Sequence, residues 1–211
     1  TTAMLYAIGF VSLFVSGGIT GLFLGQTSID VQLHDTYFPV AHFHMIMGVA
    51  ALFGIFGGTY YWFPKMFGRM LNEWWGKFHF WITFIGVNAI FIPMHLMGIM
   101  GGLRRYAQST EFKFLEPLQS YQEFVSIAAF ITAAAQVIFL VNLFWSMFKG
   151  KKASENPWES TTLEWTIPSP PPHDNFAGKI PIVHHDPYEY GVPGSPRDFV
   201  MQTDPPIEKN K

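Results

Sequence analysis

Four apolar stretches, each long enough to cross a lipid bilayer, constrain this chain more than any other feature of its sequence. A membrane-spanning helix needs about 20 predominantly apolar residues. The stretches that meet this length lie at residues 2–24, 39–63, 78–100 and 121–148. Charged residues make up 13% of the chain, against about 25% in ordinary soluble domains. The sequence therefore predicts an all-α membrane protein with a four-helix transmembrane segment over residues 1–148.

The character of the chain changes after residue 148. Residues 149–211 are polar and rich in proline, with the run SPPP at residues 169–172. Such a composition favours extended chain over a packed core, so we expect an irregular C-terminal tail that wraps a subunit surface without building a core of its own. His184 and His185 in this tail could suggest copper, but solvated side chains are the simpler interpretation of a histidine pair in such a segment.

Basic residues predict the orientation of the chain, because lysine and arginine collect in short loops on the cytoplasmic side of a membrane. Two basic clusters share one face, one after the second stretch and one after the fourth: Lys65, Arg69 and Lys77, then Lys149, Lys151 and Lys152. We expect that face, and the tail with it, to be cytoplasmic. Arg104 and Arg105 then lie on the translocated face, where two adjacent guanidiniums predict fixed anionic partners.

Net charge and cysteine content exclude several classes of protein. The formal net charge is −2 and the chain has no cysteine, so we expect no nucleic-acid partner and exclude thiolate ligands and disulfides within the chain.

The chain starts at the edge of an apolar stretch without an initiator methionine, so we expect a fragment of a larger polypeptide. Gly17, Gly18 and Gly21 in the first stretch predict close packing between helices.

His42 and His44 stand near the start of the second stretch, in the sequence TYFPVAHFHMIM. Each residue of an α-helix turns by ~100°, so rings two positions apart leave the helix about 200° apart and cannot both bind one small ion. Because an unbound polar ring is costly inside a membrane, the pair fits two metal centres on either side of one helix. Haem is suitable, since its iron takes an axial imidazole and its propionates would be anions for the arginine pair. The alternative is two core histidines satisfied by neighbouring side chains.

Other polar residues allow more than one interpretation. His34 and Asp35, in the loop before the second stretch, could ligate a divalent cation such as Mg²⁺. Alternatively, Asp35 could cap the following helix while His34 lies on the surface. His79 and His95, near the two ends of the third stretch, are most simply hydrogen-bonded histidines of the helix bundle.

Three segments of the chain resemble a known family. HDTYFPVAHFHMIMGVAALFGIFGGTYYWFP, GVNAIFIPMHLMGIMGGLRRYAQ and TTLEWTIPSPPPHDNF follow one another with apolar stretches between them. They resemble the C-terminal part of subunit I of haem-copper cytochrome c oxidase, and the resemblance covers nearly all of residues 3–176. Subunit I in that family has a core of twelve helices, and this chain looks like the last four.

The resemblance implies a role for each residue of the histidine region. His42 would be the axial ligand of the high-spin, oxygen-binding haem a3 and so part of the catalytic centre. His44 would ligate the low-spin haem a, with Phe43 between the two groups. His34 and Asp35 match the family's Mg²⁺ site, where a further ligand is expected from subunit II.

The resemblance also implies partners and an activity. Arg104 and Arg105 match the pair that hydrogen-bonds haem propionates. The ligands of the copper ion called copper B would lie outside this chain, in the N-terminal part of subunit I, so the chain alone should be inactive. Expected partners are that N-terminal part, subunit II with its dinuclear copper, subunit III, cytochrome c and the lipid bilayer. The implied activity is reduction of dioxygen to water coupled to proton pumping, in a bacterial inner membrane.

Three alternatives stay open beside this one. A quinol-oxidising member of the same superfamily would differ in its electron donor. A cytochrome b of the quinol–cytochrome c reductase type would need histidine pairs repeated on two helices about four turns apart, and this sequence has none. A non-catalytic membrane assembly subunit would use His42 and His44 only for packing.

Overall fold

The computed structural model describes residues 1–106 and 112–207. Along the chain the elements are α1 (Thr2–Leu24), α2 (Thr27–Leu33), α3 (Tyr37–Phe43), the π-helix η1 (His44–Val49), α4 (Ala50–Phe67), α5 (Glu73–Ile99), the 3₁₀-helix η3 (Lys113–Leu118), α6 (Gln119–Lys149) and the 3₁₀-helix η4 (Leu163–Trp165). They form two compact units. We call them the helical unit, which is Thr1–Tyr60 with Glu73–Leu143, and the tail unit, which is Tyr61–Asn72 with Phe144–Lys211.

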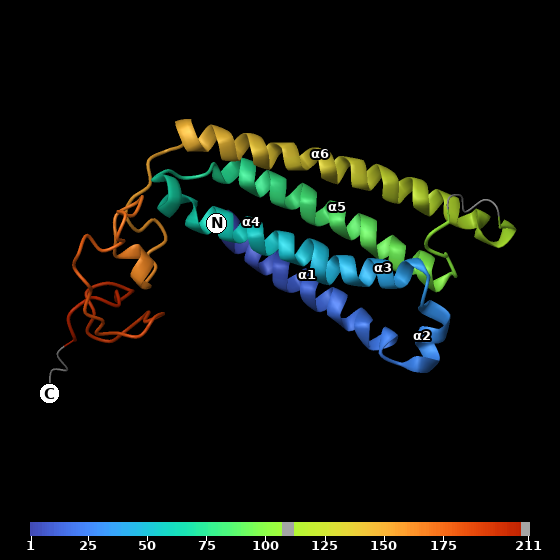
Figure 1. Ribbon diagram of the computed structural model, residues 1–211, viewed down its shortest axis with the longest axis horizontal. Helices are drawn as coiled ribbons and strands as arrows, with labels where there is room; N and C mark the ends of the chain where they lie inside the picture. Colours follow the sequence, from blue (N-terminus) through green and yellow to red (C-terminus); the bar gives the residue numbers. More distant parts are fainter. Residues whose placement is uncertain (107–111, 208–211) are drawn as a thin grey trace. The chain divides into compact units, whose positions relative to one another are not determined.

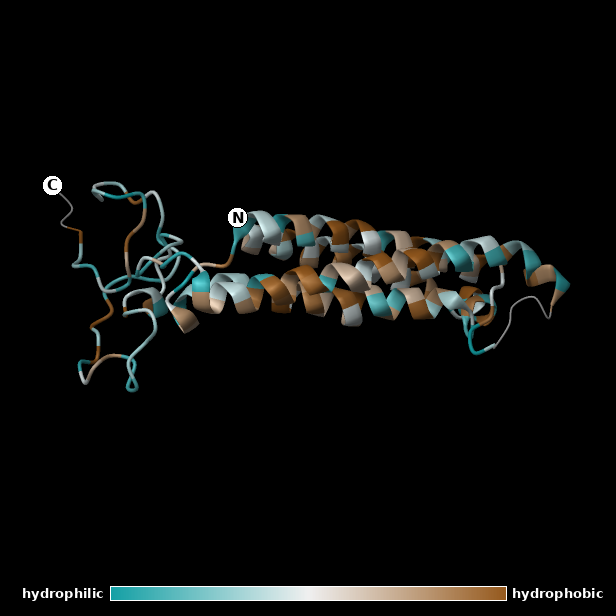
Figure 2. Ribbon diagram, turned by 90° about the horizontal axis from the view of Figure 1, so that it is seen from above, coloured by the Kyte–Doolittle hydropathy of each residue, from teal (hydrophilic) through white to brown (hydrophobic). Residues whose placement is uncertain are grey.

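In the described part of the chain, four helical segments are long and apolar enough to cross a membrane: Thr2–Leu24, Tyr37–Phe67, Glu73–Ile99 and Lys113–Lys149. Figure 2 shows apolar residues along these helices and polar residues in the chain that follows them. Residues 1–106 and 112–207 contain helices and isolated bridges but no strand. The predicted all-α class with four spanning helices is therefore confirmed.

The second spanning segment is longer than residues 39–63. It begins at Tyr37, where the Thr36 hydroxyl caps the helix by accepting a hydrogen bond from Phe38 N at 3.1 Å. It continues through Pro64, which lies inside α4 near its C-terminal end. It ends where Gly68 takes φ +65° and donates its N–H to Pro64 O at 2.8 Å. This left-handed conformation is the usual end of a helix and favours glycine.

Tyr6 is at the centre of the helical unit. Its side chain is fully buried and its ring packs against Phe53 and Phe80 at centroid distances of 5.3 and 5.1 Å. The Tyr6 hydroxyl and His79 Nδ1 are 2.5 Å apart. One residue therefore joins α1 to α4 by ring packing and to α5 by both packing and a hydrogen bond.

A second polar link joins α5 to α6. His79 Nε2 lies 3.0 Å from Gln136 Oε1, and the Gln136 amide donates to Thr83 Oγ1 at 3.2 Å. Tyr60 and Asn142 form another pair, in which the amide donates to the phenol oxygen at 3.0 Å. Such hydrogen bonds hold helices together where lipid provides no hydrophobic driving force. Figure 1 shows α5 between α6 on one side and α3 and α4 on the other.

The tail unit has a small core, which corrects the prediction of extended chain without one. Trp165, Thr161 and Val200 are 2%, 0% and 3% exposed. Trp165 Nε1 donates to the Tyr61 hydroxyl at 2.9 Å, and that hydroxyl donates to Ser160 Oγ at 3.0 Å. The prediction was wrong because composition described the tail alone, whereas residues 61–72 supply one wall of its core.

Lys65 is part of that wall. Its side chain is 7% exposed, and its ammonium donates to Ile167 O at 2.7 Å. The same ammonium lies 4.9 Å from the centroid of the Trp165 ring, a distance at which cation–π attraction is favourable. A buried cation thus links the end of α4 to the segment that follows η4.

Candidate functional site

Two consecutive helical segments, α3 and η1, carry the two histidines of the site. His42 lies in the last turn of α3, and His44 is the first residue of η1. Both segments pack against α1 and α5. The start of α3 is fixed by Thr36, whose hydroxyl also donates to Leu33 O at 2.6 Å. The alternative in which Asp35 caps this helix is therefore wrong.

The His42 ring is held against α1. Its Nδ1–H donates to Gly17 O at 2.9 Å and to Thr20 Oγ1 at 2.8 Å. The Thr20 hydroxyl in turn donates to Gly17 O at 2.6 Å. A Cβ atom on Gly21 would come within 2.8 Å of His42 Cε1. The ring therefore occupies space that α1 provides only because residue 21 is a glycine.

The His44 ring faces a different neighbour. Its Nδ1–H donates to Val40 O at 2.8 Å. The ring stacks on Phe91 of α5 with centroids 5.4 Å apart and planes inclined by 18°. Phe43, which is 41% exposed, has its ring centroid 4.4 Å from that of His44. The two histidines thus contact α1 and α5 respectively, as their spacing on the helix predicts.

The hydrogen bonds define which nitrogen of each ring can bind a metal. A carbonyl oxygen only accepts, so Nδ1 of both His42 and His44 must carry the proton. In the neutral ring the lone pair then lies on Nε2, which is the form of imidazole that ligates a metal. A backbone partner on the other nitrogen also fixes the ring orientation. The donor set fits an axial imidazole on each side of the helix.

The π-helix begins at His44 itself. Its six residues, His44–Val49, replace a stretch of α-helix between α3 and α4. π-Helical turns are rare and often occur at functional sites. No periodic pattern of side chains in the sequence identifies so short a segment.

The loop that precedes α3 is bonded to the loop that follows α5. The Asp35 carboxylate accepts from Arg104 Nη2 at 2.6 Å and from Nε at 3.0 Å. The same two residues also form a backbone hydrogen bond, in which Arg104 N donates to Asp35 O at 3.0 Å. The hydrogen bond from Arg104 and its positive charge lower the pKa of Asp35. Arg104 thus has a fixed anionic partner, as predicted for this face, and that partner is a carboxylate of the same chain.

The remaining predicted residues lie near this loop. His34 donates from Nδ1 to Asp30 O at 2.8 Å and is exposed. Arg105 is exposed and takes φ +71°. Over residues 1–106 and 112–207, no three histidine, aspartate or glutamate side chains form a group that could hold a metal ion. The Mg²⁺ site at His34 and Asp35 stays a prediction.

Two other histidines are buried in the helical unit. His79 has partners on both ring nitrogens, which agrees with a hydrogen-bonded bundle histidine. His95 donates from Nδ1 to Phe91 O at 2.8 Å, and its buried Nε2 has no partner among the described residues. Thr20 is the contact residue that sequence reasoning missed. A hydroxyl in an apolar stretch is its only signal, and nothing pairs it with a histidine 22 positions away.

Comparison with known proteins identifies relatives of this chain. Residues 1–131 match the family model described as cytochrome c and quinol oxidase polypeptide I. The alternative cytochrome c oxidase subunit 1 of Bradyrhizobium diazoefficiens is 49% identical over 208 residues, which are 98% of this chain and 35% of the relative. Cytochrome c oxidase subunit 1 of Synechocystis is 46% identical over 192 residues, 90% of this chain and 34% of the relative.

A solved structure shows the same fold. The structure of a heme-copper terminal oxidase dimer superposes with a TM-score of 0.62 at 18% identity, and the match covers 72% of this chain and 28% of that one. The chain spans about a third of the length of the curated relatives it matches.

These matches confirm the family resemblance of the sequence. Four apolar helices, together with relatives that are membrane oxidases, identify a multi-pass membrane protein. The chain belongs to the cytochrome c and quinol oxidase polypeptide I family.

Proposed function

We propose that this chain is the haem-binding C-terminal portion of subunit I of a terminal oxidase. His42 is the axial ligand of the high-spin haem a3, and His44 is an axial ligand of the low-spin haem a. The observation that carries the proposal is that both rings donate from Nδ1 to backbone carbonyls while they face different helices. Each Nε2 lone pair is then available to a separate iron centre.

The chain's own residues hold and separate the two groups. Because only Phe43 separates His42 from His44, the chain itself would fix how far apart the two groups lie. The carbonyl oxygens of Gly17 and Val40 keep the rings in one tautomer and orientation. Arg104 and Arg105 provide guanidiniums for the haem propionates, and Asp35 orients the first of them.

The metal groups supply electron transfer and the binding and reduction of dioxygen when they are bound. In this proposal copper B is held by the N-terminal part of subunit I, and Mg²⁺ is held by His34 and Asp35 together with subunit II. In this proposal cytochrome c is the electron donor, subunit II would carry the dinuclear copper, subunit III would complete the complex, and proton pumping would accompany turnover. The complex lies in a bacterial inner membrane with residues 149–211 on the cytoplasmic side and no nucleic acid bound.

Visible spectroscopy of the purified complex tests the ligand assignment. We expect His42→Leu to remove the haem that binds carbon monoxide, and His44→Leu to remove the low-spin signal. His95→Leu is a matched control, because it removes a buried histidine of the same unit that holds no haem in this proposal. Retention of both haem signals in the His42 and His44 variants would show that the ligands lie elsewhere.

The same complex separates the alternatives. Oxidation of reduced cytochrome c supports the proposed donor, which the names of the relatives favour. Oxygen consumption with a quinol but not with cytochrome c would assign the chain to the quinol-oxidising branch. A complex that contains no haem would leave a membrane assembly subunit.

A further inference from the structure

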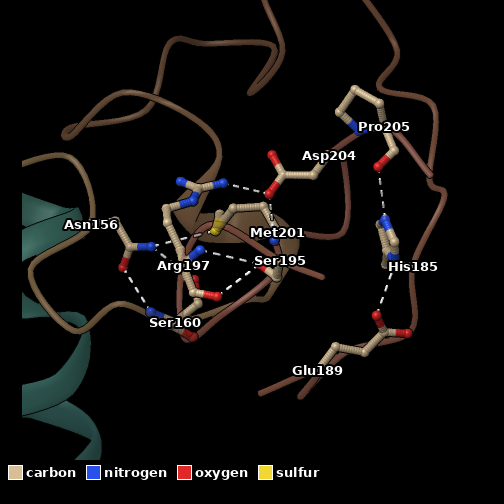
Figure 3. A network of polar contacts seen from close by, with 9 residues as sticks. All are labelled: Asn156, Ser160, His185, Glu189, Ser195, Arg197, Met201, Asp204 and Pro205. Carbon is tan, nitrogen blue, oxygen red and sulfur yellow. Dashed lines mark hydrogen bonds and ion pairs between the residues drawn. The ribbon is translucent and has the colours of Figure 1, made fainter. Parts of the chain in front are cut away.

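The ring of His185 lies between two acceptors in the tail unit. Its Nδ1 is 2.9 Å from a carboxylate oxygen of Glu189, and its Nε2 is 3.2 Å from the backbone oxygen of Pro205 (Figure 3). Glu189 is four residues further along the same segment, whereas Pro205 is near the end of the described chain. The imidazole therefore joins two segments that are 20 residues apart.

Both contacts can be hydrogen bonds only when the ring is cationic. A carboxylate and a carbonyl oxygen accept but cannot donate, and neutral imidazole has one N–H and one lone pair. If the imidazolium lost a proton, one ring nitrogen would face its oxygen with a lone pair, and that hydrogen bond would be lost. The carboxylate is the stronger acceptor, because a charge-assisted hydrogen bond is about twice as strong as a neutral one. Neutral His185 should therefore keep Glu189 and release Pro205.

The charges around the ring favour the cation. Glu189 faces it directly, and Asp204 lies on the segment that carries Pro205. Asp186 follows His185 in the chain, and its backbone N–H donates to the other oxygen of Glu189 at 3.2 Å. Arg197 is the positive group nearby, but its guanidinium is paired with Asp204 at 2.5 Å.

The rest of the segment has its own attachments. The Asp204 carboxylate also accepts from Met201 N at 2.9 Å, and Gln202 N donates to Thr161 O at 3.1 Å. Val200 and Met201 are buried. Loss of the contact between His185 and Pro205 would therefore free the chain only beyond Asp204 and leave the core of the tail unit in place.

We propose that His185 is a pH-operated latch, in which the imidazolium holds residues 205–207 against residues 185–189 and the neutral imidazole releases them. The latch is independent of the haem assignment, since all of its groups belong to the tail unit. No metal takes part in it. The sequence favours solvated side chains for this histidine pair; His184 is exposed, whereas both nitrogens of His185 have protein partners.

The direction of the pH dependence follows from the contacts. The hydrogen bond to Pro205 O and the interactions with Glu189 and Asp204 raise the pKa of His185 above its ordinary value. A group whose pKa is raised in the folded state contributes fully below its unfolded pKa and loses that contribution as pH rises through the folded value. The latch is therefore closed below the ordinary pKa of histidine and opens as pH rises above it.

A spin label on the assembled complex measures the latch. The chain has no cysteine, so Pro206→Cys gives one labelling position on this chain, at an exposed residue next to the contact. The nitroxide spectrum is recorded from about pH 5 to about pH 9, a range that brackets histidine titration. We expect an immobile label at low pH and a mobile label above the transition.

Three variants decide the outcome. His185→Gln, whose side chain does not titrate, should lose the transition, and His184→Gln should keep it because His184 is an exposed neighbour. Glu189→Gln should shift the midpoint to lower pH, since it removes the facing carboxylate. The proposal is overturned if the protein labelled at Pro206→Cys, with no other substitution, shows no transition in label mobility. It is also overturned if His185→Gln retains the transition or if Glu189→Gln leaves its midpoint unchanged.

Discussion

Replacement of Gly21 by alanine probes how closely α1 must approach the His42 ring. The new Cβ would lie 2.8 Å from Cε1 and 3.4 Å from Nε2 of His42. The first distance is shorter than any ordinary carbon contact, so the ring or the helix must move. Movement of the ring would weaken the hydrogen bonds from Nδ1 to Gly17 and Thr20.

Two opposing effects determine the size of the change. Alanine is about 0.5–1 kcal/mol more favourable than glycine within a helix. Overpacking of a close contact costs about 1–3 kcal/mol. Gly18→Ala is the matched control, because it has the same helix gain and no atom of the described chain within 4 Å of its Cβ. We therefore expect Gly21→Ala to be about 1–3 kcal/mol less stable than Gly18→Ala, which isolates the cost of the contact.

The assay combines stability with the haem spectrum. Denaturant titration of the detergent-solubilised complex compares the two variants, and the carbon monoxide difference spectrum reports the haem that we assign to His42. We expect a reduced carbon monoxide signal in Gly21→Ala and an unchanged one in Gly18→Ala. Equal stability and equal spectra in the two variants would refute the idea that the close approach of α1 positions the ring.

Two further predictions concern polar contacts. Tyr6→Phe removes the hydroxyl partner of His79 Nδ1 and leaves a buried ring nitrogen unpaired, so we expect a loss of about 1–3 kcal/mol in denaturant titration. The double variant Tyr6→Phe with His79→Leu should lose less free energy of unfolding than the two single variants lose in sum. If the two losses simply add, the hydrogen bond does not contribute to stability. Lys65→Met keeps the apolar stem but loses the charged donor to Ile167 O, which costs about 1.5–3 kcal/mol. Amide exchange near Trp165 should become faster in that variant, and unchanged protection would contradict the anchoring role of Lys65.

Much of the helical unit could be predicted because the formation of a spanning helix depends on residues that are close together in the sequence. Length and hydropathy are enough to find a spanning helix, so the four stretches were found and only their ends differed. The opposite directions of His42 and His44 follow from the pitch of a helix alone. The anionic partner of Arg104 could be expected from its position, but its identity as Asp35 could not, because the contact joins residues 69 positions apart.

The features that were missed depend on contacts between distant parts of the chain. The core of the tail unit requires Tyr61 and Lys65 to meet Trp165, and composition alone predicts extended chain for such a segment. The bonds of His185 likewise depend on a backbone oxygen, which leaves no trace in the amino-acid sequence. The metal-binding role of His34 and the propionate-binding role of Arg105 rest on family resemblance and stay predictions.

The second spanning segment both carries His42 and packs on α1 through Phe53, and the short π-helix lies between these two parts. A π turn contains about one residue more than an α turn, so it shifts the rotational phase of everything that follows by roughly 100°. His42 lies before this shift, and Phe53, which packs on Tyr6, lies after it. The direction of the ligand and the direction of the packing face can therefore change independently. Deletion of one residue between His44 and Val49 would turn Phe53 away from Tyr6 without turning the helix that carries His42.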